Sequence, residues 1–151
     1  MITHTASFGS SGESRPIPWA DASPYVVLGG RALFSLIFIM ASLGHFSRET
    51  IGFAASQGVP LANVAVPLSG IIALAGGLSV LLGYRAKLGA WLLVVFLVPV
   101  TLAPHQFWAE HDPMMAQMQQ VMFMKNLSML GAALFLSQTG AGPLSLDARR
   151  G

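Results

Sequence analysis

Five side chains of this sequence could together bind a ligand and act on it. They are His45, His105, Trp108, Lys125 and Asn126. Lysine and asparagine donate hydrogen bonds to carbonyl oxygens, an indole covers a ring, and imidazole exchanges protons near neutral pH. A quinone or another carbonyl-bearing ligand needs these groups, so we expect a ligand site wherever the chain brings them together.

Long uncharged segments separate these residues. From Arg31 to Asp147, counting both ends, nine charged side chains leave uncharged runs of 16, 35, 22 and 21 residues. A bilayer core of about 30 Å takes roughly 20 apolar residues as helix. The chain has 54% hydrophobic and 9% charged residues, whereas soluble domains carry roughly 25% charged residues. The sequence therefore predicts an all-α membrane protein, with four transmembrane helices in an antiparallel bundle in contact with the lipid bilayer.

We expect the four spans at about residues 25–46, 62–83, 88–103 and 121–138, in one domain of residues 25–147. Residues 1–24 are expected to form a polar, flexible tail, because they lack the apolar segment of a signal peptide. Residues 148–151 form a short basic tail. Gly52, Gly58 and Pro60 predict a loop before the second span, and His105 to Gln120 is expected to connect the last two.

The distribution of basic residues predicts the orientation. Four spans place both termini and the turn from Arg85 to Lys87 on one side, which then holds six basic residues, against Arg48 and Lys125 on the other. Because cytoplasmic loops carry the excess of lysine and arginine, we expect both termini in the cytoplasm.

That orientation brings both histidines, Lys125 and Asn126 together on the outer side. An alternative without a ligand stays open: Lys125 extends toward Glu110 or Asp112, and histidines at helix ends are common interface residues.

Arg31 and Asp147 are expected to lie near the cytoplasmic face, at the start of the first span and just after the fourth. A guanidinium in or near hydrocarbon requires a partner, so we expect a structural ion pair that closes the bundle. Binding of a lipid phosphate or a quinone head group by Arg31 is the alternative. Ser69, Ala73 and Gly77 recur every four residues, which favours close helix packing within the bundle and leaves a homo-oligomer as the alternative.

Other chemistry finds less support. Cysteine is absent, which excludes thiolate metal sites and disulfides. A metal site would use His45, His105 and His111, or His111 with nearby methionines, but methionine is also an ordinary apolar filler. No pair of histidines at mid-membrane depth suggests haem. The scattered basic residues do not support nucleic-acid binding. Ser145 and Asp147 are expected on the opposite side from the histidines, so a hydrolytic triad is excluded.

Seven short motifs, in order across residues 25 to 147, carry a resemblance to a known family. They are Gly30-Arg31, Gly44-His45-Phe46, Gly76-Gly77, Leu82-Gly83-Tyr84-Arg85, His105-Gln106-Phe107-Trp108, Lys125-Asn126-Leu127 and Gly140-x-Gly142-x-x-Ser145-Leu146-Asp147. By these motifs the chain resembles the DoxX family.

The resemblance implies a small four-helix protein of bacterial inner membranes, linked in some members to quinone-dependent redox systems. One departure is Ala73, in a segment Ile72-Ala73-Leu74 where many members of that family carry an acidic residue.

Three functions follow as hypotheses. The first is a membrane subunit or accessory of a redox system, possessing no independent catalytic motif, that binds quinone or a redox partner subunit through the outer polar residues. The second is a non-catalytic scaffold or assembly protein, which would use the small residues and the Arg31–Asp147 pair. The third is a small-solute transporter, which Ala73 disfavours because transport usually needs ionisable groups within the membrane.

Overall fold

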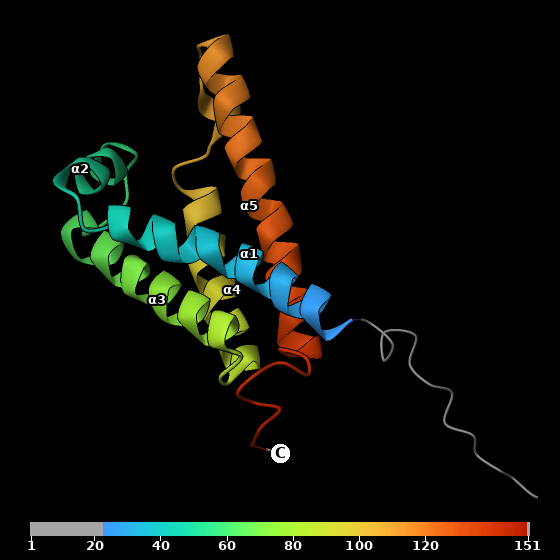
Figure 1. The fold of residues 1–151 in the computed structure, drawn as a ribbon. Coiled ribbons are helices and arrows are strands. Elements are labelled where there is room, and N and C mark those ends of the chain that lie inside the picture. The colour runs from blue at the N-terminus through green and yellow to red at the C-terminus, as the bar shows by residue number, and fades with distance from the viewer. Residues whose placement is uncertain (1–22, 151) are drawn as a thin grey trace, which may run out of the picture.

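The computed structural model describes residues 23–150, and every regular element in that range is a helix. In chain order these are α1 (Pro24–Gly44), α2 (Arg48–Ser56), α3 (Ala62–Leu82), α4 (Ala86–Leu102), the short 3-10 helix η1 (Phe107–Ala109) and α5 (Pro113–Thr139). Figure 1 shows α1 beside α3, and α5 extending beyond the other helices at its N-terminal end. Residues 1–22 of the predicted tail at residues 1–24 lie outside the described residues, and so does Gly151.

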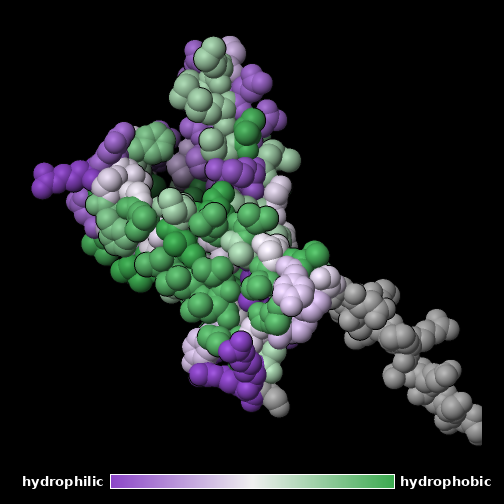
Figure 2. All heavy atoms as spheres, in the orientation of Figure 1, coloured by the Kyte–Doolittle hydropathy of each residue, from purple (hydrophilic) through white to green (hydrophobic). Residues whose placement is uncertain are grey.

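The surface of the long helices is apolar. Leu33 is 75% exposed and Val95 is 58% exposed, and Figure 2 shows an apolar region between two more hydrophilic ends. Exposing such an apolar surface to water is unfavourable, whereas contact with lipid hydrocarbon is favourable. Three segments are long and apolar enough to cross a bilayer: α1, α3 and Ala86–Ala109. The chain is therefore a membrane protein with helices in contact with lipid.

The predicted fourth span is not among these three segments. The helix α5 is long, but Lys125, Asn126 and several glutamines lower its hydropathy. The all-helical prediction is confirmed, whereas the count of four spans remains a prediction.

The helices pack in the order α1 on α3, α3 on α4, and α4 on α5. Their shared core contains Phe38, Ala73, Leu93, Leu97 and Ala133, which are almost fully buried. Small residues at these contacts let the helices approach closely, which matters in lipid because packing largely replaces the hydrophobic effect between helices.

The loop expected before α3 begins with a helix instead. The Ser47 side chain accepts a hydrogen bond from the Thr50 N–H at 3.1 Å, which caps the N-terminus of α2, and Glu49 lies in its first turn. These are strong helix-start signals. Gly58, with φ +79°, follows the helix end. The prediction of a loop at Gly52 is therefore wrong, because one glycine does not prevent a capped helix.

The last helix begins earlier than the predicted span at residue 121. The Asp112 carboxylate accepts from the Met115 N–H at 2.9 Å, and Pro113 occupies the first helical turn. A capping aspartate followed by proline favours helix initiation. Apolar length alone, from which the span was predicted, does not detect a polar first half.

Candidate ligand-binding site

A cavity of about 140 Å³ lies between α1, α4 and α5. Four of the five side chains proposed from the sequence line it: His45, His105, Lys125 and Asn126. The remaining wall is apolar and comes from the same helices: Ile37, Phe38, Ala41, Phe96, Leu97, Val100 and Met129. The fold therefore places residues from distant parts of the chain around one partly apolar space.

The backbone fixes the proton on His45. This residue is the C-cap of α1, and its Nδ1 lies 2.9 Å from the Ala41 carbonyl oxygen. A carbonyl oxygen can only accept, so Nδ1 donates, and Nε2 of the neutral ring carries the lone pair. The ring also lies 5.5 Å from that of Phe96, which restricts its orientation.

His105 is held in the same way by a side chain of α5. Its Nδ1 lies 2.7 Å from Gln119 Oε1, which connects the segment after α4 to α5. With Nδ1 donating to this oxygen, Nε2 is again the acceptor atom of the neutral ring. The cavity is thus lined by two imidazoles that each use Nδ1 within the protein.

Asn126 is the most buried polar residue of the cavity, with 5% of its surface exposed. Within residues 23–150 its side-chain amide forms no hydrogen bond. Neither amide atom is among the fully enclosed polar atoms without a partner, so the amide remains accessible from the cavity that Asn126 lines. Lys125 is exposed next to it, and its Nζ lies 3.3 Å from Met122 Sδ. Within the described range it pairs with neither Glu110 nor Asp112, so the alternative partners considered for it are not used.

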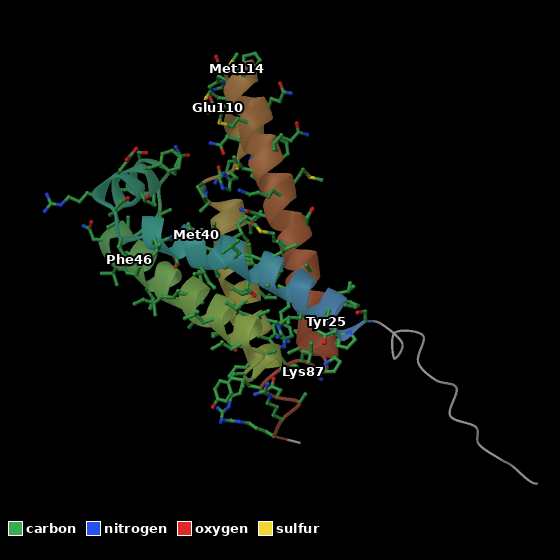
Figure 3. The ribbon with its side chains drawn as sticks, viewed as in Figure 1. Tyr25, Met40, Phe46, Lys87, Glu110 and Met114 are labelled. Atoms are coloured by element: carbon green, nitrogen blue, oxygen red, sulfur yellow. The ribbon has the colours of Figure 1, made fainter. Side chains whose placement is uncertain are left out.

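The other proposed site residues lie elsewhere. Trp108 is 59% exposed and packs edge-on against Phe107 and Phe123, with ring centroids 5.0 and 5.9 Å away. Figure 3 shows Glu110 and Met114 at the outlying end of α5, and the exposed His111 follows Glu110. No group of three or more histidine, cysteine or acidic residues suited to a metal ion occurs in the described part of the chain.

Arg31 closes the opposite end of the bundle. It is only 4% exposed, and its two terminal nitrogens donate to the carbonyl oxygens of Ala141 and Leu144, the second at 2.7 Å. Its Nε has no partner in the structure. The guanidinium therefore joins the start of α1 to the segment that follows α5.

Asp147 acts at the same end but uses other partners. Its carboxylate accepts from the backbone N–H groups of Arg85, at 2.7 Å, and Ala86, at 2.9 Å. The predicted ion pair between Arg31 and Asp147 is not formed in residues 23–150. Backbone groups at the ends of helices need hydrogen-bond partners. Asp147 pairs with those at the start of α4 and Arg31 with those after α5, so the two charged side chains do not pair with each other.

Comparison with known proteins decides the family. The family model described as the SURF4 family matches residues 18–151. The chain belongs to the SURF4 family.

Two similar proteins come from Escherichia coli strain K12. Inner membrane protein YphA is 27% identical over 137 residues, which are 89% of this chain and 97% of YphA. Inner membrane protein YqjF is 32% identical over 127 residues, which are 80% of this chain and 88% of YqjF. No solved structure matches this SURF4-family chain.

The assignment to the DoxX family from short motifs is therefore wrong. The motifs combine glycines at helix contacts with aromatic and basic residues at helix ends. Packing in lipid and the membrane interface favour these residue types in many small helical membrane proteins. The resemblance therefore no longer supports a quinone-linked role, and any argument for such a role must come from the cavity.

The small-residue row of the SURF4-family chain is used only in part as expected. Gly77 faces α1, where an added Cβ would lie 3.1 Å from the Ile39 side chain, and Ala73 is fully buried. Ser69 instead donates to the Val66 carbonyl at 2.7 Å within its own helix. The contacts of Gly77 are intramolecular.

Sequence reasoning missed several residues of the cavity and of the packing. Gln119, Asn126 and Met129 are spaced by seven and three residues, which places them on one face of α5. That spacing was a usable signal for the partner of His105. Gly76 and Gly89, where α3 and α4 meet, carried no such signal, because a glycine in a membrane helix has no preferred partner in the sequence.

Asp147 provides a prediction on pH. The Ala86 N–H above all, with that of Arg85, holds the pKa of this carboxyl below its ordinary value of 3.8, although burial opposes the shift. A depressed folded-state pKa gives stability that is complete above the ordinary value and disappears as the pH falls through the folded value.

Asp147→Asn keeps one acceptor oxygen but sets an amide NH2 against the other backbone N–H, so it should lower the free energy of unfolding by about 1 kcal/mol at neutral pH. The difference in stability from the parent chain should vanish in strong acid. Thermal unfolding in detergent, repeated from neutral pH down to strong acid, measures it. A difference independent of pH would contradict a role for the charge.

Proposed function

We propose that the chain crosses the bacterial inner membrane four times, with both termini in the cytoplasm. Arg31, at the start of α1, binds carbonyls that follow α5. The Leu146 N–H likewise donates to the Leu82 carbonyl, at the end of α3, at 3.2 Å. If α1, α3 and α4 cross, α5 must return to the starting side for these contacts to form. The excess of basic residues at that end supports a cytoplasmic location, and the names of both relatives support the inner membrane.

We propose further that the cavity binds a ligand with a single ring and oxygen substituents, with a quinone head group as the first candidate. The observation that supports this most is the side-chain amide of Asn126, which lines the cavity beside two imidazoles and has no hydrogen-bond partner within residues 23–150. A cavity of about 150 Å³ can hold one benzene-sized ring, and this cavity has about 140 Å³. The protein would then act as a membrane subunit or accessory of a redox system rather than as an independent enzyme.

The polar residues of the cavity would act as hydrogen-bond donors or acceptors toward the ligand. Lys125 and Asn126 would donate to a carbonyl oxygen of the ring, whereas Nε2 of His45 and His105 would accept from a hydroxyl. Phe38 and Phe96, whose rings are nearly perpendicular to each other, would provide apolar contacts to the ligand ring. When a redox partner accepts the electrons of a bound hydroquinone, neutral imidazole can take up the proton that the hydroxyl releases, which is the role that a redox accessory needs.

The test uses the full chain purified in mild detergent, with a short-chain benzoquinone and its hydroquinone as probes. Asn126→Leu should weaken binding by about tenfold, because one hydrogen bond to the ligand is lost. The thermal unfolding temperature should stay about the same, because the amide forms no hydrogen bond within residues 23–150 that the substitution would break. Titration calorimetry gives the binding constants, and native mass spectrometry of protein from its own membranes identifies a bound molecule.

A histidine outside the cavity provides the control. His105→Ala should weaken binding as Asn126→Leu does, whereas His111→Ala should leave it unchanged. If neither probe binds and the cavity variants alter only stability, the ligand proposal fails and a non-catalytic scaffold replaces it.

A further inference from the structure

A second and larger cavity, of about 500 Å³, lies at the end of the molecule opposite the histidines. Its wall combines two cations with apolar and small residues from the start of α4 and the segment after α5. They include Arg85, Lys87, Leu88, Ala141 and Asp147. The role proposed for the histidine cavity uses none of these residues.

The charge of this cavity is not balanced within the described protein. Arg85 and Lys87 are exposed, and neither forms an ion pair within residues 23–150. The carboxylate of Asp147 also lies in the wall, but it accepts hydrogen bonds from the backbone N–H groups of Arg85 and Ala86. Two cations therefore line the cavity against one carboxylate, so the wall carries a net positive charge.

The position of the cavity matches a boundary of the apolar surface. Figure 3 labels Lys87 at the same end as Tyr25, away from Glu110 and Met114. In Figure 2 this hydrophilic end borders the apolar region directly. The apolar part of the wall, with Leu88 and Ala141, is provided by the helix α4 and by the segment after α5, so a bound molecule would contact both charge and hydrocarbon.

We propose that this cavity binds the phosphate of an anionic phospholipid, with the acyl chains along the adjacent apolar helix surface. Basic pockets between membrane helices on the cytoplasmic side suit such head groups, and this cavity lies at the end for which we propose a cytoplasmic location. Lysine and arginine both bind phosphate, the arginine through a planar pair of donors. A free phosphate ion would share the polar contacts but not the apolar ones.

The experiment measures lipid binding to the full chain in mild detergent by native mass spectrometry. Phosphatidylglycerol is the probe, with phosphatidylcholine for lipid without net charge and inorganic phosphate for the anion alone. The parent chain should retain phosphatidylglycerol and should unfold at a higher temperature in its presence. Each cation near a membrane surface is worth about fivefold in affinity, so Lys87→Gln should weaken binding about fivefold and Lys87→Gln with Arg85→Gln about 25-fold.

Two control variants separate this site from general attraction of anionic lipid. Arg48→Gln removes an exposed cation in α2, outside the cavity, and should leave binding unchanged. Lys87→Arg keeps the charge and should keep binding. Equal weakening by Arg48→Gln and Lys87→Gln would overturn the proposal. So would stabilisation by inorganic phosphate as large as that by phosphatidylglycerol.

Discussion

Gly76→Leu is expected to lower the free energy of unfolding by more than about 3 kcal/mol, the upper end of the usual cost of overpacking. The helices α3 and α4 meet at this residue. A Cβ on Gly76 would lie 2.8 Å from a methyl carbon of Leu93 and 3.0 Å from the Gly89 carbonyl oxygen. The leucine methyl can move, but the carbonyl belongs to a helix backbone, so the helices must separate.

The clash recurs from the other side of the contact. A Cβ on Gly89 would meet the Ser79 side chain and lie 3.1 Å from the Gly76 carbonyl. Separation costs more in lipid than surface repacking, because helix association there depends on close contact. Gly76→Ala should give a smaller loss, of about 2 kcal/mol. Thermal and denaturant unfolding in detergent measure both.

Gly131 is the matched control for this prediction. It also lies in a long helix, but no atom is within 4 Å of a Cβ placed there. Gly131→Ala should be neutral or slightly stabilising, because alanine favours helix over glycine by about 1 kcal/mol. Equal unfolding temperatures for Gly76→Leu and Gly131→Leu would mean that α3 and α4 do not meet at Gly76.

Arg31→Met should have the second largest effect, a loss of about 2 to 4 kcal/mol. Two contributions oppose each other. Methionine removes the cost of burying a charge, but the carbonyls of Ala141 and Leu144 lose their donors, and each orphaned buried group costs about 1 to 3 kcal/mol. Removing one partner of a buried polar contact is generally destabilising even where replacing all partners is not, so the carbonyls decide the sign.

Hydrogen exchange tests the mechanism of this effect. The N–H groups of Leu146 and Asp147 bond to the carbonyls of Leu82 and Gly83, at 3.2 and 2.7 Å, and they should exchange faster when the segment is released. Arg31→Lys should be intermediate, since an ammonium lacks the two-nitrogen fork. Arg149→Met, which removes an exposed cation nearby, should change neither measurement. Slow exchange at both amides in Arg31→Met would contradict the proposed role of Arg31 in holding the segment after α5 against the start of α1.

The polar site shows how far prediction from the sequence could extend. His45 and Asn126 were singled out as polar groups near the ends of apolar runs, and the structure places both on one cavity. Trp108 is predicted to cover the ligand ring but lies outside the cavity, because it packs against Phe107 and Phe123. Gln119 was missed because its role depends on contact with His105, which is 14 residues away.

The sequence by itself determined the class of molecule. Long uncharged runs can be buried only in lipid, and lipid requires backbone hydrogen bonds within each segment, so a helical membrane protein follows from composition and charge spacing. The caps at Ser47 and Asp112 are equally local, and they mark the N-terminal ends of α2 and α5.

The tertiary structure alone decided which polar groups meet. Arg31 and Asp147 were expected to pair because opposite charges at one end of a bundle attract. In the fold each is closer to unpaired backbone groups, and satisfying those groups is worth more than an ion pair. The contact between Gly76 and Gly89 is likewise absent from any local pattern, because the approach of two helices depends on both surfaces at once.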